Sequence, residues 1–289
     1  MEKRIDFRDQ IARNNLKSFA LILIIFLVFV GLGYVISKAF NPGYFFIIMI
    51  ASIIISLLYI WVGYYNSAKI AVASVGAKKA SVHEYKQYHS IVEGLTIASG
   101  LPKPELYVMN SPQINAFASG RNPQHSVVCV TTGALEKLDK KELEGVLAHE
   151  LSHVGNHDIR YMTIATVLVG MIAIASELFL RTMWYGDSDN KHPFLIVFGL
   201  VLAILAPIVV QLVQLAISRR REYNADASAV KFTRYPNGLI GALKKIKAEN
   251  YVEKRVSKAI APLFFSNPLK GMFSTHPDIS KRIEILQRM

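Results

Sequence analysis

Apolar positions follow a helical repeat between residues 138 and 155. They fall on one side of a helix, at Leu143, Val146, Leu147, Leu151 and Val154. Asp139 is a predicted N-cap, and Glu142, three residues later, is its capping-box partner, while Leu138 and Leu143 form a hydrophobic staple. We expect Gly155 to end the helix. The pattern therefore predicts an amphipathic helix with one face in a core.

Four other stretches are continuously apolar and long enough to cross a bilayer, at about 18–37, 44–64, 162–180 and 194–217. The first is too long for the core of a cleaved signal peptide and is interpreted as a retained signal anchor. Lys and Arg are dense before the first run and after the second and fourth, which places these flanks in the cytoplasm. We therefore expect a multi-pass protein of the plasma (cell inner) membrane.

Shorter patterns lie between these runs. Residues 82–99 have the spacing of an amphipathic helix that ends at Gly100. Residues 105–109, 114–118 and 126–131 are rich in β-branched and aromatic side chains between turn signals, which predicts three short strands. The fold class is thus mostly α with a small β-sheet.

Composition agrees with a membrane protein. The chain has 289 residues, of which 52% are hydrophobic, and a net charge of +12. The cations are spread along the chain and concentrate beside the apolar runs, with no basic patch interleaved with aromatics, so we expect no nucleic-acid partner. The single cysteine, Cys129, cannot form an intramolecular disulfide and is expected to pack in a core strand.

The helix at 139–155 contains a His-Glu-x-x-His pattern. His149 and His153 are four residues apart and therefore share a helical face, so both imidazoles can reach one metal ion, and zinc suits such a pair. Glu150 is placed to take a proton from a water molecule at the metal. These residue types predict a zinc site with Glu150 as general base.

A candidate third ligand follows the fourth apolar run. Glu222 and Asp226 lie on one face if the run continues as a helix, so one carboxylate can bind the metal and the other can support a ligand histidine. Taken alone, the pair is better explained as a solvated helix end in which Glu222 answers the arginines before it; beside the His-Glu-x-x-His helix the ligand interpretation is favoured. Three protein ligands with one open position are typical of catalytic zinc.

The strand near Asn115 and Ala116 is a second candidate site. An exposed strand edge beside a zinc helix can bind an extended peptide by adding it to the sheet. A plain structural strand is the alternative, and the residues alone leave both open.

Several motifs, in this order, resemble the HtpX family of membrane-bound zinc endopeptidases along nearly the whole chain. They are 91–95, 100–104, 115–122, 130–133, 142–146, 149–153, Glu222 with Asp226, and 275–277 with Arg282 and Ile283. The resemblance implies a gluzincin-type α+β zincin-like catalytic domain with four transmembrane α-helices and one Zn²⁺ per chain. It implies His149, His153 and Glu222 as metal ligands and Asp226 as their support. Asn115 and Ala116 match its substrate strand, and His276 matches a position near the site with a transition-state or structural role.

We accordingly expect the parts to be 1–65 (cytoplasmic tail and transmembrane hairpin), 66–160 (first half of the cytoplasmic catalytic domain), 161–217 (second hairpin) and 218–289 (second half). The expected function is zinc-dependent cleavage of misfolded or damaged membrane proteins, or other unfolded polypeptides, from the cytoplasmic side of the lipid bilayer. The alternatives are a CAAX prenyl-protein peptidase, whose chain is longer, and a zinc-binding membrane chaperone or scaffold without catalysis. The oligomeric state is not predicted.

Overall fold

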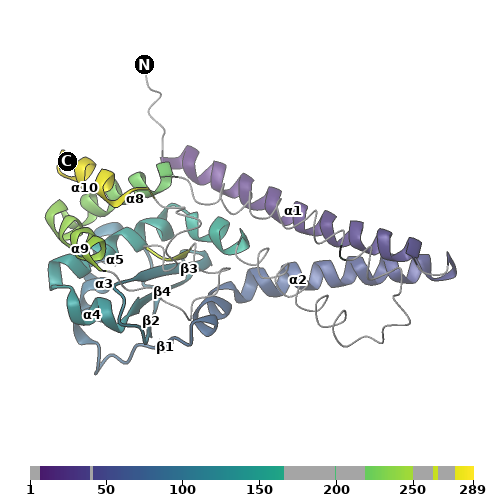
Figure 1. The fold of residues 1–289 in the computed structure, drawn as a ribbon, viewed down its shortest axis with the longest axis horizontal. Coiled ribbons are helices and arrows are strands. Elements are labelled where there is room, and N and C mark those ends of the chain that lie inside the picture. Colours follow the sequence, from purple (N-terminus) through teal and green to yellow (C-terminus); the bar gives the residue numbers. More distant parts are fainter. Residues whose placement is uncertain (1–6, 40–41, 166–198, 200–218, 250–262, 266–276) are drawn as a thin grey trace, which may run out of the picture.

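The computed structural model describes residues 7–39, 42–165, 199, 219–249, 263–265 and 277–289. The expected spans at 162–180 and 194–217 lie outside this part of the chain, apart from 162–165 and residue 199. The described residues form a long helical hairpin and a lobe that contains a small sheet (Figure 1).

Two long helices form the hairpin. Helix α1 covers Phe7–Ala39, a 3₁₀ turn covers Pro42–Tyr44, and α2 covers Phe45–Ser74. The two helices lie side by side and project away from the sheet (Figure 1). Both are long and apolar enough to cross a membrane, and only 6% of the apolar segment of α2 is buried inside the protein. A bilayer would cover its exposed isoleucine and leucine side chains.

The lobe contains a four-stranded mixed sheet with helices packed against it. The strands are β1 (Lys78–Lys79), β2 (Glu105–Met109), β3 (Ala116–Asn122) and β4 (His125–Thr131). Their order is β1-β2-β4-β3; β2 and β4 are parallel, and the two outer pairs are antiparallel. The helices are α3 (Lys86–Ser99), α4 (Thr132–Lys137), α5 (Lys140–Gly155), α8 (Arg219–Thr233), α9 (Pro236–Ala248) and α10 (Ile279–Leu286).

The sequence located most of these elements. The strand at 105–109 is confirmed, and Cys129 is buried in β4 as expected. The helix predicted at 82–99 ends before Gly100 as expected but begins at Lys86, because residues 82–84 form a turn. The strand predicted at 114–118 instead runs from Ala116 to Asn122. It starts later because the backbone N–H of Ile114 donates to the Glu249 side chain and that of Asn115 to the Thr131 hydroxyl. Helix α4 and the short β1 were not predicted.

Helix α5 lies at the centre of the lobe, between the sheet and α9 (Figure 1). Its capping box is confirmed: Asp139 accepts from the N–H of Glu142, and the Glu142 carboxylate accepts from the N–H of Asp139. The apolar face is fully buried in the main core, where Leu143, Val146, Leu147, Leu151 and Val154 lie. The central helix of the lobe is therefore also the helix that carries the candidate ligands.

Helix α5 ends at Gly155, as the sequence predicted. Gly155 is the last helical residue, but the cap is Asn156 in a right-handed conformation, and the left-handed residue is His157, with φ of 58°. The predicted end of the helix at Gly155 is therefore confirmed, although the glycine itself does not adopt the left-handed conformation. Gly155 also packs closely against Leu101, since a Cβ at position 155 would lie 3.3 Å from the Leu101 side chain.

Candidate metal centre

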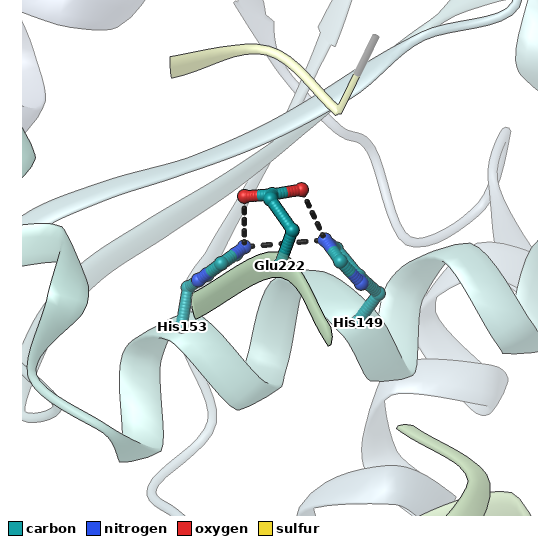
Figure 2. A group of neighbouring side chains, drawn as sticks. All are labelled: His149, His153 and Glu222. Atoms are coloured by element: carbon teal, nitrogen blue, oxygen red, sulfur yellow. Dashed lines mark hydrogen bonds and ion pairs between the residues drawn. The ribbon is translucent and has the colours of Figure 1, made fainter. Parts of the chain in front are cut away.

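His149 and His153 point their Nε2 atoms at one another from successive turns of α5 (Figure 2). The two Nε2 atoms are 3.2 Å apart, and the side chains are 1% and 7% exposed. The rings are nearly perpendicular, with centroids 4.8 Å apart. The i, i+4 spacing has therefore produced the convergence that the sequence predicted.

Glu222 joins this pair from the neighbouring helix α8, which packs against α5. One carboxylate oxygen lies 3.6 Å from His149 Nε2 and the other 3.6 Å from His153 Nε2 (Figure 2). One ligand atom from each of the three residues falls within 4.8 Å of the others, and all three side chains are buried. A residue 69 positions beyond His153 along the chain thus completes the group.

Two C-terminal residues support His149. Asp226, one turn after Glu222 on α8, accepts a hydrogen bond from His149 Nδ1 at 2.9 Å. Arg282 of α10 donates to both Asp226 oxygens, at 2.6 and 2.9 Å, and is 1% exposed. Because Nδ1 carries the donated proton, Nε2 is left as the metal-binding atom. Arg282 appeared in the sequence only as part of a family motif, and no role was predicted for it.

The charges of this cluster shift its pKa values strongly. Burial lowers the pKa of His149, but the Asp226 and Glu222 carboxylates outweigh it and raise the pKa to about 9. Burial acts to raise the pKa of Asp226, and the Arg282 guanidinium and His149 hold it below its ordinary value instead. The ion pair between Asp226 and Arg282 is therefore charged throughout the neutral range.

Asp158 supports His153 in the corresponding way, and sequence reasoning missed it. Its Oδ2 accepts from His153 Nδ1 at 3.0 Å, and the side chain is fully buried. Its Oδ1 accepts from the side-chain amide of Asn14 in α1 at 2.8 Å. A carboxylate five residues after the second histidine was the available signal, because the turn that ends α5 brings it back beside the imidazole.

The donor set fits a zinc ion. With both Nδ1 atoms bonded to carboxylates, the two Nε2 atoms lie 3.2 Å apart and become the two lone-pair donors of one cation once His149 gives up its second ring proton. Two ligands bound to one tetrahedral zinc ion lie roughly 3.3 Å apart. Two imidazoles and one carboxylate are also a typical ligand set for catalytic zinc.

Glu150 lies next to the ligands, between α5 and the sheet. Its side chain is 1% exposed, and the carboxylate accepts a hydrogen bond from the backbone of Ala118 in β3. Its Oε1 atom is buried and has no hydrogen-bond partner among the described residues. Burial raises the pKa of this carboxyl above its usual range. A proton acceptor with a spare buried oxygen beside a metal site is suited to general-base work.

The candidate substrate strand β3 is one of the two outer strands of the described sheet, with β1 at the other edge. The expectation that its edge is exposed is wrong at Ala116 and Phe117, which are 0% and 1% exposed. The backbone N–H of Phe265 donates to the carbonyl of Ala116 at 2.7 Å, and Phe264 forms an antiparallel bridge with Phe117. The Phe265 ring also stacks edge-on against His149, with centroids 4.8 Å apart. Residues 263–265 therefore occupy the strand edge.

The remaining predicted site residues are divided. Asn115 is buried directly before β3, where its side-chain oxygen accepts from the N–H of Ala116. His276 lies outside the described residues. Within the described part, the structure thus brings together His149, Glu150, His153, Glu222 and Asp226, and it adds Asp158 and Arg282 to them.

Comparisons with known proteins agree with this arrangement. Residues 83–289 match the profile of Peptidase family M48. The chain is 42% identical to the Protease HtpX homolog of Caldanaerobacter subterraneus subsp. tengcongensis, over 100% of this chain and 99% of that protein. It is 40% identical to the Protease HtpX homolog of Tropheryma whipplei, over 96% of this chain and 97% of that protein.

A solved structure resembles the whole fold. The crystal structure of Ste24p from S. mikatae matches with a TM-score of 0.53 at 20% sequence identity. The match covers 95% of this chain and 65% of that one. At this identity the likeness concerns the fold, a mostly helical protein with a small zincin-like sheet.

Proposed function

Because the chain belongs to the HtpX proteases of Peptidase family M48 and is a membrane metalloprotease, we propose that His149, His153 and Glu222 bind its catalytic zinc ion and that Glu150 is its general base. The observation that carries this proposal is the convergence of two imidazole Nε2 atoms and one carboxylate in a buried site, with both Nδ1 atoms held by aspartates. One zinc ion per chain satisfies this donor set.

The reaction is hydrolysis of an internal peptide bond. A bound zinc ion supplies a Lewis acid that polarises the scissile carbonyl and acidifies water. Glu150 accepts the proton of the attacking water and then delivers it to the leaving amine. The raised pKa of Glu150 supports this exchange, since a carboxylate with a pKa nearer neutrality returns a proton more readily. Asp226 and Asp158 keep both ligand imidazoles in the metal-binding tautomer.

We propose that an extended substrate pairs with β3 at Asn115 and Ala116. The position of the strand supports this, because β3 is an outer strand and its Ala118 backbone contacts Glu150. Phe265 now holds the Ala116 carbonyl, so a substrate strand in this register replaces the hydrogen bond from Phe265. The isolated antiparallel bridge between Phe117 and Phe264 supports this pairing mode.

The membrane setting points to the substrate class. Helix α2 joins the lobe beside the sheet, where it contacts β3 and β4, and this supports a site near the bilayer surface (Figure 1). We propose that the runs at 162–180 and 194–217 form a second hairpin, so that 66–160 and 218–289 together make one catalytic domain on the cytoplasmic side. Substrates are then unfolded or damaged segments of membrane proteins, cleaved as part of membrane-protein quality control.

The test is zinc content together with casein cleavage in detergent, for the wild type, Glu150→Gln and His149→Ala. We expect Glu150→Gln to keep zinc and lose cleavage, since the amide cannot accept the proton, and His149→Ala to lose both. Cleavage by Glu150→Gln at the wild-type rate would contradict the proposed base. Zinc binding by all three proteins with no cleavage by any would favour a chaperone or scaffold.

A further inference from the structure

Among the described residues, Asn14 connects the first membrane helix to the metal centre. Asn14 of α1 is 4% exposed, although it lies near the start of a helix whose apolar residues are largely exposed. Its side-chain amide donates to Asp158 Oδ1 at 2.8 Å and to the carbonyl of Asn156 at 3.1 Å. Asn156 is the C-cap of α5, the helix that carries both histidines.

These contacts form one continuous path. Asn14 donates to one oxygen of Asp158, and the other oxygen of Asp158 accepts from His153 Nδ1 at 3.0 Å. All three side chains are buried. The orientation of the Asn14 amide is fixed, because its NH₂ group faces two acceptors and its reversal would point an oxygen at the Asn156 carbonyl.

We propose that Asn14 is a positioning residue: through Asp158 it sets the tautomer and orientation of His153, and it thereby couples the docking of the first membrane helix to the affinity of the metal site. The inference rests on the proposed zinc site. It goes beyond that site by adding a residue 139 positions away from His153 that touches neither metal nor substrate.

The neighbouring residue provides a matched control. Asn15 also links α1 to the lobe, since its side-chain oxygen accepts from Arg160 at 3.0 Å. Arg160 in turn donates to the backbone carbonyl of Arg121, at the end of β3. Asn14 and Asn15 therefore both attach the helix to the lobe, but in the described contacts only Asn14 leads to a metal ligand.

The hydrogen-bond pattern predicts an unusual effect of Asp158→Asn. The Asn14 amide selects the orientation in which the new side chain turns its oxygen toward Asn14 and its NH₂ group toward His153. An NH₂ group facing Nδ1 makes Nδ1 an acceptor and places the proton on Nε2, which then cannot bind a metal. Adding Asn14→Asp reverses this preference, because a carboxylate at position 14 accepts from the new amide and leaves its oxygen for His153.

The experiment measures the apparent zinc Kd by chelator competition in detergent for full-length protein, with the visible spectrum of bound Co²⁺ as a second readout. We expect Asp158→Asn to raise the Kd about 10–100-fold and Asn14→Ala to raise it about threefold or more. Asn15→Ala should leave the Kd and the Co²⁺ spectrum unchanged. The double variant Asp158→Asn with Asn14→Asp should recover part of the affinity, not all, because the Asn156 carbonyl loses its donor.

Two results would overturn the inference while leaving the zinc site in place. One is an equal change of Kd in Asn14→Ala and Asn15→Ala; the other is a double variant that binds zinc no better than Asp158→Asn. If Asn14→Ala does not fold, the comparison of the double variant with Asp158→Asn still tests the role of Asn14. If wild type and His149→Ala bind zinc equally weakly, the proposed metal site itself is wrong, and this inference falls with it.

Discussion

The two histidines of α5 are one helical turn apart, yet opposite ends of the chain support them. His149 donates a hydrogen bond to Asp226, and the buried Arg282 of the last helix donates two hydrogen bonds to the same carboxylate. His153 bonds to Asp158, which accepts from the neutral amide of Asn14 in the first helix. One support is a buried ion pair with two short hydrogen bonds, and the other is a hydrogen bond from a neutral amide, with the Arg221 guanidinium farther off at 4.0 Å from Asp158 Oδ1.

The difference shows what the site needs in order to form. A carboxylate that orients a ligand histidine needs a hydrogen-bond donor to fix its own position. Asn14, near the N-terminus, is that donor for Asp158, and Arg282, near the C-terminus, is that donor for Asp226. The site is therefore complete only when the N-terminal hairpin and the C-terminal helices have both docked on α5. Disturbing the charged support should cost folding stability, while disturbing the amide support should mainly alter metal affinity.

The largest effect is expected for Arg282→Ala. This change leaves the buried Asp226 and Glu222 carboxylates without their arginine and should destabilise the metal-free protein by about 3–5 kcal/mol. Chemical unfolding of metal-free protein in detergent measures it. Arg282→Lys, which keeps the charge but loses the two-pronged geometry, should fall between alanine and wild type. Wild-type stability in Arg282→Ala would show that the ion pair is not the support of His149.

A pH series sharpens the comparison at His149. Metal binding requires the neutral imidazole, and the pKa of about 9 means that this group must lose a proton at neutral pH. Zinc affinity should therefore rise about tenfold per pH unit toward pH 9. The stability that protonated His149 gives the metal-free protein should instead be complete below its unfolded pKa, about 6.5, and be lost as the pH rises through about 9.

Both trends can be followed on the same preparation. Calorimetric titration with zinc in two buffers of different ionisation enthalpy counts the protons released, and thermal unfolding follows the metal-free stability. An affinity that stays constant between pH 7 and 9 would contradict the raised pKa of His149.

Gly145→Ala tests the packing of α5, the helix of both histidines, against α9. A Cβ at Gly145 would lie 2.6 Å from the backbone nitrogen of Leu239 in α9, so the two helices would have to move apart. We expect a loss of about 1–3 kcal/mol. Gly94→Ala on α3 is the control, because its Cβ meets nothing within 4 Å, and the helix propensity of alanine should stabilise it by up to about 1 kcal/mol. A stabilised Gly145→Ala would mean that α5 is not packed tightly on α9.

The smallest effect is expected at the far end of α5. Asp139→Ala removes the side-chain acceptor for the N–H groups of Lys141 and Glu142 and should cost about 1 kcal/mol of stability. Asp139→Asn should cost less, because the amide oxygen can still accept. Zinc affinity should be the same in all three proteins; a change in it would show that α5 transmits disturbance along its length.

The sequence predicted features that depend on neighbouring residues. The limits of α5 come from Asp139, Glu142 and a helical apolar repeat, and the convergence of His149 with His153 follows from helix geometry alone. The position of Glu222 required the additional assumption of a continuous helix through Asp226, which α8 satisfies.

The supporting contacts could not be derived in the same way. Asn14 and Arg282 lie 135 and 133 residues from His149, and an asparagine or arginine carries no periodic signal that names its partner. Asp158 was closer, but its approach to His153 depends on the left-handed turn at His157, an unusual conformation for a residue other than glycine. Burial of the β3 edge likewise depends on Phe265, far along the chain.

The most direct test of the central claim is the zinc K-edge X-ray absorption spectrum of the purified wild-type protein. We expect nitrogen and oxygen ligands at about 2.0–2.2 Å, imidazole scattering from two histidines, and no sulfur at about 2.3 Å. A sulfur ligand would implicate Cys129, which is buried in β4 and is no member of the His149, His153 and Glu222 group, and a spectrum without paired imidazole scattering would exclude His149 and His153. Either result would contradict the metal centre described above.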